Sequence, residues 1–176
     1  FADIRSNLRT ADVESDYLIK SYDSLIGSGL IYRLGDPQLI IRLGDLPLSK
    51  SLNTYLQKIK SRIITLSTDG TWLDDAHITN HFCYVDEVAM VDELWRRSSS
   101  KPENKWANTV VALAQQSMKI TTGEIAKSFF DCSAITKVFQ DLALDDHTRI
   151  FLGNSNSIRH VDQFVFTTPP GSEIYS

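Results

Sequence analysis

Short apolar runs alternate with amphipathic segments along most of this chain, and this alternation limits its fold more than any other feature. The runs have the length of strands and show little of the polar alternation expected of a half-exposed strand. We predict strands over residues 38–43, 62–66, 81–85 and 149–152. Strands separated by helices indicate βαβ units. The expected fold class is therefore α/β, a Rossmann-like, doubly wound and mainly parallel sheet with helices on both faces.

Amphipathic helices are expected between these strands, and two of them are clear in the sequence. Ser49 and Ser133 are suitable N-caps for them. Their apolar positions follow the spacing i, i+3, i+4 and i+7: Leu52, Tyr55, Leu56 and Ile59 in the first, and Ile135, Val138, Phe139 and Leu142 in the second. Further helices are expected after Asp12, Asp86 and Asn104. Residues 98–103 are the best linker candidate, and residues 121–123 mark the expected domain boundary.

One junction between a predicted strand and a predicted helix has the features of an anion site. Gly153 allows a sharp turn, and Asn154, Ser155 and Ser157 are all suitable N-caps. The free backbone N–H groups of a first helical turn suit an anion, and Arg159 on that turn could close over a carboxylate as a fork. The alternative is a capped turn with a solvated arginine, because such turns are generic in α/β folds.

Composition disfavours several classes of protein. A length of 176 residues suits one domain, or one domain plus part of another. The formal net charge of −4 disfavours non-specific nucleic-acid binding, and no apolar run approaches the roughly 18 residues of a membrane span. Two cysteines suggest no disulfide framework, so the cytoplasm is the expected compartment. The chain starts and ends abruptly, and we expect it to be a fragment of a longer protein.

Residues that could bind a metal or act as a nucleophile are present, but their spacing is not typical of such sites. The four residues of suitable ligand type that lie close together are Asp74, Asp75, His77 and His81. They fit no zinc signature, so a solvated acidic loop is favoured. Cys83 reads as core packing, and Cys132 has no basic residue beside it in the sequence. The absence of a Gly-x-Gly-x-x-Gly fingerprint disfavours a nicotinamide-dependent oxidoreductase.

Three stretches of the chain resemble one enzyme family. The first is Ala2-Asp3-x-x-Ser6-x-Leu8-Arg9, and the second is Leu39-Ile40-Ile41-Arg42-Leu43-Gly44-x-x-Pro47-x-Ser49-Lys50. The third is Phe151-Leu152-Gly153-Asn154-Ser155-x-x-x-Arg159-x-x-Asp162, with Pro170, Gly171 and Tyr175-Ser176 behind it. They resemble MenD, 2-succinyl-5-enolpyruvyl-6-hydroxy-3-cyclohexene-1-carboxylate synthase, a thiamine-diphosphate enzyme of menaquinone synthesis. The resemblance implies that residues 1–122 form its middle domain and residues 123–176 open its C-terminal cofactor-binding domain.

The resemblance also implies a reaction and a set of binding residues. The parent enzyme would decarboxylate 2-oxoglutarate and add the resulting thiamine-bound carbanion to isochorismate. It would use thiamine diphosphate and Mg²⁺ and act as a homo-oligomer. Asn154, Ser155 and Arg159 match positions that contact the carboxylate derived from 2-oxoglutarate, and Lys50 matches a lysine associated with substrate carboxylates. Many members carry a second basic residue after this lysine, where this chain has Ser51.

The groups that do the central chemistry in the family lie outside this chain. The Gly-Asp…Asn-Asn segment that holds the diphosphate and magnesium lies downstream, and the glutamate that activates the cofactor belongs to the N-terminal domain. We therefore expect the chain alone to contain no catalytic residue, to bind no cofactor or metal, and to be inactive. The alternative is a free-standing Rossmann-like module that binds a small carboxylate or a nucleotide.

Overall fold

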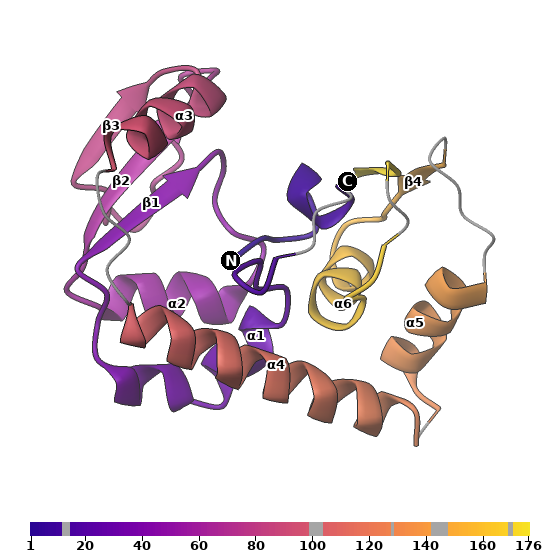
Figure 1. Cartoon of the computed structure of the whole chain (residues 1–176). Helices are drawn as coiled ribbons and strands as arrows, with labels where there is room; N and C mark the ends of the chain where they lie inside the picture. The colour runs from indigo at the N-terminus through magenta and orange to yellow at the C-terminus, as the bar shows by residue number, and fades with distance from the viewer. Residues whose placement is uncertain (12–14, 99–103, 128, 142–147, 169–170) are drawn as a thin grey trace. The chain divides into compact units, whose positions relative to one another are not determined.

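The structure is a computed structural model of the chain, and it describes residues 1–11, 15–98, 104–127, 129–141, 148–168 and 171–176 (Figure 1). These residues form two compact units. The terminal unit consists of Phe1–Ile31 and Ala107–Ser176, and the central unit consists of Tyr32–Trp106. A short 3-10 helix, η2 (Leu30–Leu34), crosses from the first unit into the second.

The central unit is built on a three-stranded parallel sheet (Figure 1). Its strands are β1 (Leu39–Leu43), β2 (Arg62–Ser67) and β3 (His81–Tyr84), in that spatial order. Leu39 pairs with Arg62, and Ile64 pairs with His81. Helix α2 (Lys50–Lys58) connects β1 to β2, and helix α3 (Glu87–Arg97) follows β3. Three of the four predicted strands are thus confirmed, together with their parallel pairing.

Local capping explains where the helices of the central unit begin. The Ser49 hydroxyl accepts a hydrogen bond of 3.0 Å from the backbone N–H of Leu52, as its predicted role as N-cap of α2 requires. The Asp86 carboxylate accepts one of 2.9 Å from the N–H of Ala89 at the start of α3. Both predicted caps are confirmed because a cap depends only on residues three positions away.

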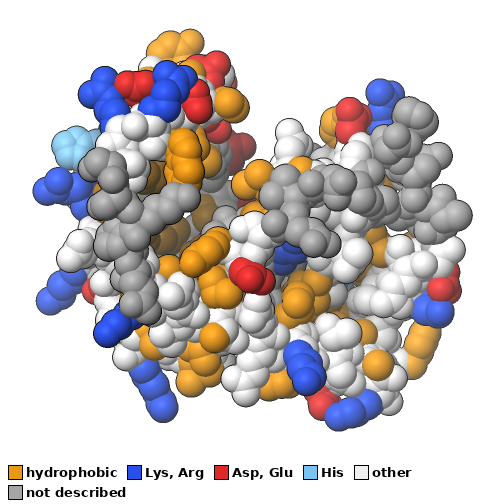
Figure 2. Space-filling view, in the orientation of Figure 1, with side chains coloured by type: hydrophobic (Ala, Val, Ile, Leu, Met, Phe, Trp, Pro, Cys, Tyr) orange, Lys and Arg blue, Asp and Glu red, His pale blue; other side chains and the backbone are white. Residues whose placement is uncertain are grey.

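Burial in the central unit follows position in the sheet. The middle strand β2 carries buried Ile63, Thr65 and Leu66, as a strand with a neighbour on each side should. On β1 the alternate residues Leu39, Ile41 and Leu43 are 42–47% exposed, so the expectation of strands covered on both faces fails there. Helix α3 has no buried residue, and Figure 2 shows hydrophobic side chains among charged ones on the protein surface.

The terminal unit combines helices with a second, two-stranded parallel sheet. Its elements are η1 (Asn7–Arg9), α1 (Tyr22–Gly27), α4 (Lys105–Ile125, which begins in the central unit), α5 (Asp131–Asp141), β4 (Arg149–Phe151), α6 (Asn156–Phe164) and β5 (Glu173–Tyr175). Strand β4 pairs with β5, which was not predicted. The fourth predicted strand, β4, therefore lies in a separate sheet from β1, β2 and β3. This agrees with the expectation that β4 begins another domain. The α/β class, with parallel strands and helices around them, is confirmed.

Several local predictions for the terminal unit are wrong. The helix expected after Asp12 is the short α1, with Tyr17 in a turn before it, and Asp12 itself is outside the described residues. Strand β4 was expected to be buried, but Phe151 is 76% exposed. Ser133 lies inside α5, where its hydroxyl bonds the backbone of Phe130 at 2.7 and 2.8 Å. Leu142, expected on the apolar face of this helix, also lies outside the described residues.

The expected domain boundary at residues 121–123 lies inside α4. A glycine within a helix costs about 1 kcal/mol relative to alanine, which a helix of 21 residues tolerates. Of the linker predicted at residues 98–103, residues 99–103 fall outside the described part of the chain. The assignment of residues 1–122 and 123–176 to two domains stays a prediction. No helix among the described residues is long and apolar enough to cross a membrane.

Candidate functional site

The turn between β4 and α6 holds an unusual backbone conformation at Ser155. The residue has φ 75° and ψ −120°, and it is one of two non-glycine residues with positive φ in the described part of the chain. Residues other than glycine rarely adopt this backbone conformation. It costs of order 1–3 kcal/mol and persists only where the surroundings enforce it. Ser155 occupies the N-cap position of α6, yet its side chain makes no capping hydrogen bond. The first N–H groups of α6 are therefore left without this partner and suit an anion.

Three of the four predicted binding residues lie at this turn. Asn154 and Ser155 form its tip, Arg159 lies on the first turn of α6, and all three side chains are exposed. Within the described residues, Arg159 makes no hydrogen bond or ion pair with another side chain. We call Asn154, Ser155 and Arg159 the turn site. An exposed guanidinium beside helix N–H groups is an arrangement that can bind a carboxylate.

The fourth predicted residue, Lys50, belongs to the central unit. It is the first residue of α2, directly after the buried cap Ser49, and its side chain is exposed. The turn site belongs to the terminal unit, so Lys50 and the turn site lie in different units. The role of Lys50 in binding therefore stays a prediction.

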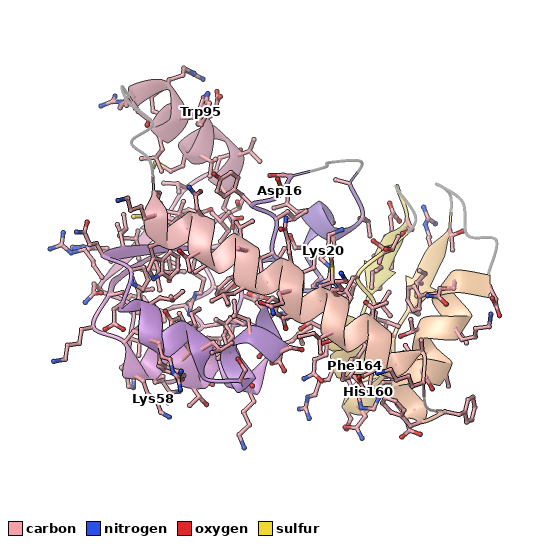
Figure 3. All side chains as sticks on the ribbon, turned by 60° about the horizontal axis from the view of Figure 1, so that its bottom comes forward. Asp16, Lys20, Lys58, Trp95, His160 and Phe164 are labelled. Carbon is pink, nitrogen blue, oxygen red and sulfur yellow. The ribbon has the colours of Figure 1, made fainter. Side chains whose placement is uncertain are left out.

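Helix α6 presents two contrasting faces. Ile158, Val161 and Val165, the residue that ends the helix, are at most 4% exposed, whereas Arg159 is exposed. Figure 3 shows His160 and Phe164 close together, and their rings meet edge to face with centroids 6.1 Å apart. The apolar residues Ile158, Val161 and Val165 thus share one buried side of this region.

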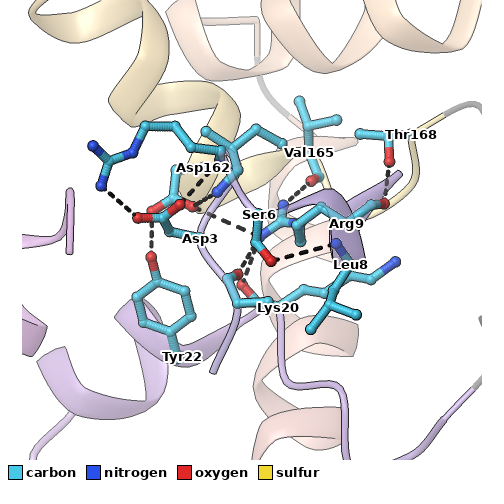
Figure 4. Close-up of polar contacts among 12 residues, drawn as sticks. Asp3, Ser6, Leu8, Arg9, Lys20, Tyr22, Asp162, Val165 and Thr168 are labelled. Atoms are coloured by element: carbon cyan, nitrogen blue, oxygen red, sulfur yellow. Dashed lines mark hydrogen bonds and ion pairs between the residues drawn. The ribbon is translucent and has the colours of Figure 1, made fainter. Parts of the chain in front are cut away.

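A buried polar cluster lies against the same helix (Figure 4), and sequence reasoning missed it. The Asp162 carboxylate accepts hydrogen bonds from the backbone N–H of Ile4 at 2.8 Å and from the Tyr22 hydroxyl at 2.5 Å. The Arg9 Nη1 atom lies 3.7 Å from Asp162 Oδ1, and both side chains are at most 2% exposed. We call Arg9, Tyr22 and Asp162 the buried cluster.

Burial dominates the electrostatics of this cluster. It raises the pKa of Asp162 to about 6, although the hydrogen bond from Tyr22 and the charge of Arg9 oppose the change. Burial and the Asp162 charge raise the pKa of Tyr22. Burial lowers the pKa of the Arg9 guanidinium, against the attraction of Asp162. An arginine with its pKa lowered in this way still carries its charge at neutral pH.

The acidic loop of the central unit has a structural explanation. Asp74 is buried and accepts backbone hydrogen bonds from Ile78 at 3.1 Å and Thr79 at 2.9 Å. Burial acts to raise the pKa of Asp74, but these hydrogen bonds and the Arg42 charge hold it below its usual value. Among the residues that the structure describes, no three His, Cys, Asp or Glu side chains are grouped as metal ligands.

Comparison with known proteins gives matches along most of the chain. A 2-succinyl-5-enolpyruvyl-6-hydroxy-3-cyclohexene-1-carboxylate synthase from Bacillus cytotoxicus is 30% identical over 94% of this chain and 28% of its own length. Synthases of the same name from Roseiflexus castenholzii and Geobacillus thermodenitrificans are 31% and 29% identical, over 81% and 95% of this chain. No protein-family model matches.

The chain is related to the MenD synthases. The resemblance predicted from three short stretches is thus confirmed, and it extends through the residues between them. The chain spans only about a quarter of the length of these relatives, 25–28%. Two of the three stretches that resemble MenD meet in the terminal unit, because Arg9 comes from the first and Asp162 from the last.

The sequence did contain a signal for the buried cluster. Asp162 lies four positions after Ile158 and one after Val161, on the face of α6 whose other residues are apolar. A charge in such a position needs a partner, because an unpaired buried charge is very costly. The identity of the partner could not be read from the sequence, since Arg9 lies in a remote segment without a helical period of its own.

Proposed function

We propose that the chain is part of a 2-succinyl-5-enolpyruvyl-6-hydroxy-3-cyclohexene-1-carboxylate synthase of menaquinone biosynthesis. The whole enzyme would decarboxylate 2-oxoglutarate and join the remaining four-carbon unit to isochorismate. We expect it to be a cytoplasmic homo-oligomer. The similarity to the MenD synthases along most of the chain supports this proposal.

Within that reaction, the proposed role of this chain is to hold the distal carboxylate of 2-oxoglutarate. The observation that carries this role is the turn site, where a strained serine and an exposed guanidinium lie at a helix N-terminus. The backbone N–H groups of α6 and the Ser155 hydroxyl can donate to one carboxylate oxygen while Arg159 donates to both. Fixing the far end of the substrate orients its reacting end, which is how positioning lowers a barrier.

We propose that this chain does not itself hold thiamine diphosphate and Mg²⁺. Magnesium sites use carboxylate oxygens together with phosphate oxygens. No group of three candidate ligands occurs in the described ranges, and the sequence has no Gly-Asp…Asn-Asn segment. We therefore assign both cofactors to parts of the synthase outside this chain, where they would supply the decarboxylation chemistry. Lys50 would contribute a positive charge to substrate carboxylates, as a point charge rather than a fork.

The proposed role of Arg159 is tested in the full-length synthase by Arg159→Ala and Arg159→Lys. A charge-assisted hydrogen bond is typically worth about 1.5–3 kcal/mol, so kcat/KM for 2-oxoglutarate should fall roughly ten- to a hundred-fold in the alanine variant. The affinity for thiamine diphosphate should stay nearly unchanged. The lysine variant should recover only part of the loss, because it lacks the planar fork. The matched control is Arg96→Ala, which removes an exposed arginine from α3. Unaltered kinetics in Arg159→Ala would remove this residue from the site.

The proposal that the cofactors bind outside this chain is tested with the 176-residue chain alone. Calorimetry with thiamine diphosphate and Mg²⁺ should show no binding, and 2-oxoglutarate should release no carbon dioxide, because the groups that hold and activate the cofactor lie elsewhere. The full-length synthase is the positive control. Carbon dioxide release by the chain alone would overturn this proposal.

A further inference from the structure

The first ten residues of the chain are tied to α6 and the segment behind it by several buried contacts (Figure 4). The N–H of Ile4 donates to Asp162 in the last turn of the helix, as described above. Further along, the Thr168 hydroxyl donates to the backbone carbonyl of Arg9, and the N–H of Gly171 donates to the carbonyl of Thr10 at 2.7 Å. The segment Ala2–Thr10 therefore contacts the last turn of α6 and the residues that follow it.

Arg9 makes the most contacts in this arrangement. Its Nη2 atom donates to the carbonyl of Val165 at 2.5 Å, and Val165 is the C-cap directly after α6. Its Nη1 atom donates to the carbonyl of Ala2 at 3.1 Å and also faces Asp162. A cation at a helix C-terminus satisfies free carbonyls and opposes the helix dipole favourably. Arg9 thus holds the C-terminal end of α6 while its charge is balanced by a residue within that helix.

The opposite end of α6 carries the turn site, and on its first turn only Ile158 is buried. Helix α6 has nine residues, which is too short for stability on its own. The neighbouring sheet has only two strands, and Phe151 and Tyr175 on it are 76% and 43% exposed. The strained conformation of Ser155 nevertheless needs surroundings that enforce it. Within the described residues of the terminal unit, the side chain of α6 with buried polar partners is Asp162.

We propose that Arg9 and Asp162 are positioning residues: by fixing α6 from its buried face, they set the orientation of Ser155 and Arg159 toward a bound carboxylate. This inference rests on the proposed function of the turn site. Neither residue would contact the substrate. Tyr22 supports them, because its hydroxyl holds the Asp162 carboxylate in place.

The kinetic test uses the full-length synthase and asks whether Arg9 acts through Arg159. The variants are Arg9→Met, Tyr22→Phe and Arg159→Ala, together with both double variants. Tyr22→Phe keeps the buried ring and removes one hydrogen bond, so it retains the fold if Arg9→Met does not. Each single substitution at Arg9 or Tyr22 should raise KM for 2-oxoglutarate, by about tenfold for Arg9→Met, with a smaller change in kcat. In the Arg159→Ala background each substitution should raise KM by a much smaller factor, because only Ser155 and the helix N–H groups remain to be oriented.

A purely structural role predicts a different pattern. Partial unfolding reduces the amount of active enzyme, so it lowers kcat by the same factor in both backgrounds and leaves KM unchanged. That result would overturn the inference. The matched control is Asp141→Asn, which neutralises an exposed carboxylate paired with Lys137 on α5 and should leave KM unchanged.

A second measurement on the 176-residue chain does not depend on the reaction. In ¹⁵N-labelled protein, Tyr22→Phe and Arg9→Met should shift the backbone amide signals of Asn154, Ser155 and Arg159, whereas Asp141→Asn should not. Unshifted signals would refute the positioning role even if the synthase is active. If the signals shift but Arg159→Ala leaves the kinetics unaltered, the proposed function fails while the positioning of the turn stands.

Discussion

The two faces of α6 each carry a charged residue, one buried and one exposed to solvent. Asp162 on the buried face is 2% exposed and is held by a backbone N–H, a phenol and a guanidinium. Arg159 on the other face is exposed, and no described residue pairs with it. The buried charge is expensive to desolvate and must be satisfied within the protein, whereas the exposed charge remains available to a ligand. One short helix thus separates the residues that hold its position from the residues that can bind.

The largest expected effect tests the buried face. Arg9→Met leaves the Asp162 carboxylate without its cation and the Val165 carbonyl without its donor. Breaking a buried ion pair in this way typically costs about 3–5 kcal/mol. The free energy of unfolding, measured by urea denaturation of the 176-residue chain, should fall by about that amount.

The matched control for this substitution is Arg96→Met in α3. Arg96 also pairs with a carboxylate, Asp92, but its side chain is 65% exposed. Exposed pairs contribute only about 0–1 kcal/mol, so this variant should unfold almost as the parent does. Equal losses in the two variants would contradict the difference between the buried and the exposed ion pair.

The sequence predicted the parts of this fold that depend on neighbouring residues. Ser49 and Asp86 were recognised as caps, and the strands around Ile63 and Phe82 as apolar runs, because each signal lies within a few positions. The turn site was located for the same reason. The conformation of Ser155 was not foreseen, since serine does not favour a positive φ and the surroundings that enforce it come from remote parts of the chain.

Features that depend on tertiary contacts could not be predicted. The exposure of Phe151 depends on how many strands join β4, and the sequence of β4 itself does not encode that number. The contact between Arg9 and Val165 joins residues 156 positions apart. Asp162 is an intermediate case. The sequence shows a charged residue on an apolar helix face, but it does not show which residue pairs with it.

The pH dependence of stability tests the environment of Asp162. Its pKa of about 6 in the folded protein lies above the ordinary value of 3.8, so the folded state holds the proton more tightly than the unfolded state. This group therefore contributes stability that is fully present below about pH 3.8 and is lost as the pH rises through about 6. Asp162→Asn should abolish that part of the pH profile, whereas Asp141→Asn should retain it.

Carbon-13 NMR of the Asp162 carboxyl group can measure the same pKa directly. The charged or titratable groups that act on it are Arg9, Tyr22 and Asp3. Tyr22→Phe removes a hydrogen bond that lowers the pKa of Asp162, so the value should move further upward in that variant. A pKa near 4 in the parent would contradict the dominance of burial in this cluster.

The smallest expected effect tests the exposed end of α6, and it uses one substitution at two positions. Ser155→Gly relieves a φ of 75°, which glycine adopts without strain, so the free energy of unfolding should rise by about 1 kcal/mol. Ser157→Gly makes the same chemical change within the helical part of α6, where glycine costs about 0.5–1 kcal/mol. The two variants should therefore change stability in opposite directions in urea denaturation. If Ser155→Gly destabilises the chain as Ser157→Gly does, the turn holds no strain, and the site would owe its geometry to ordinary helix capping.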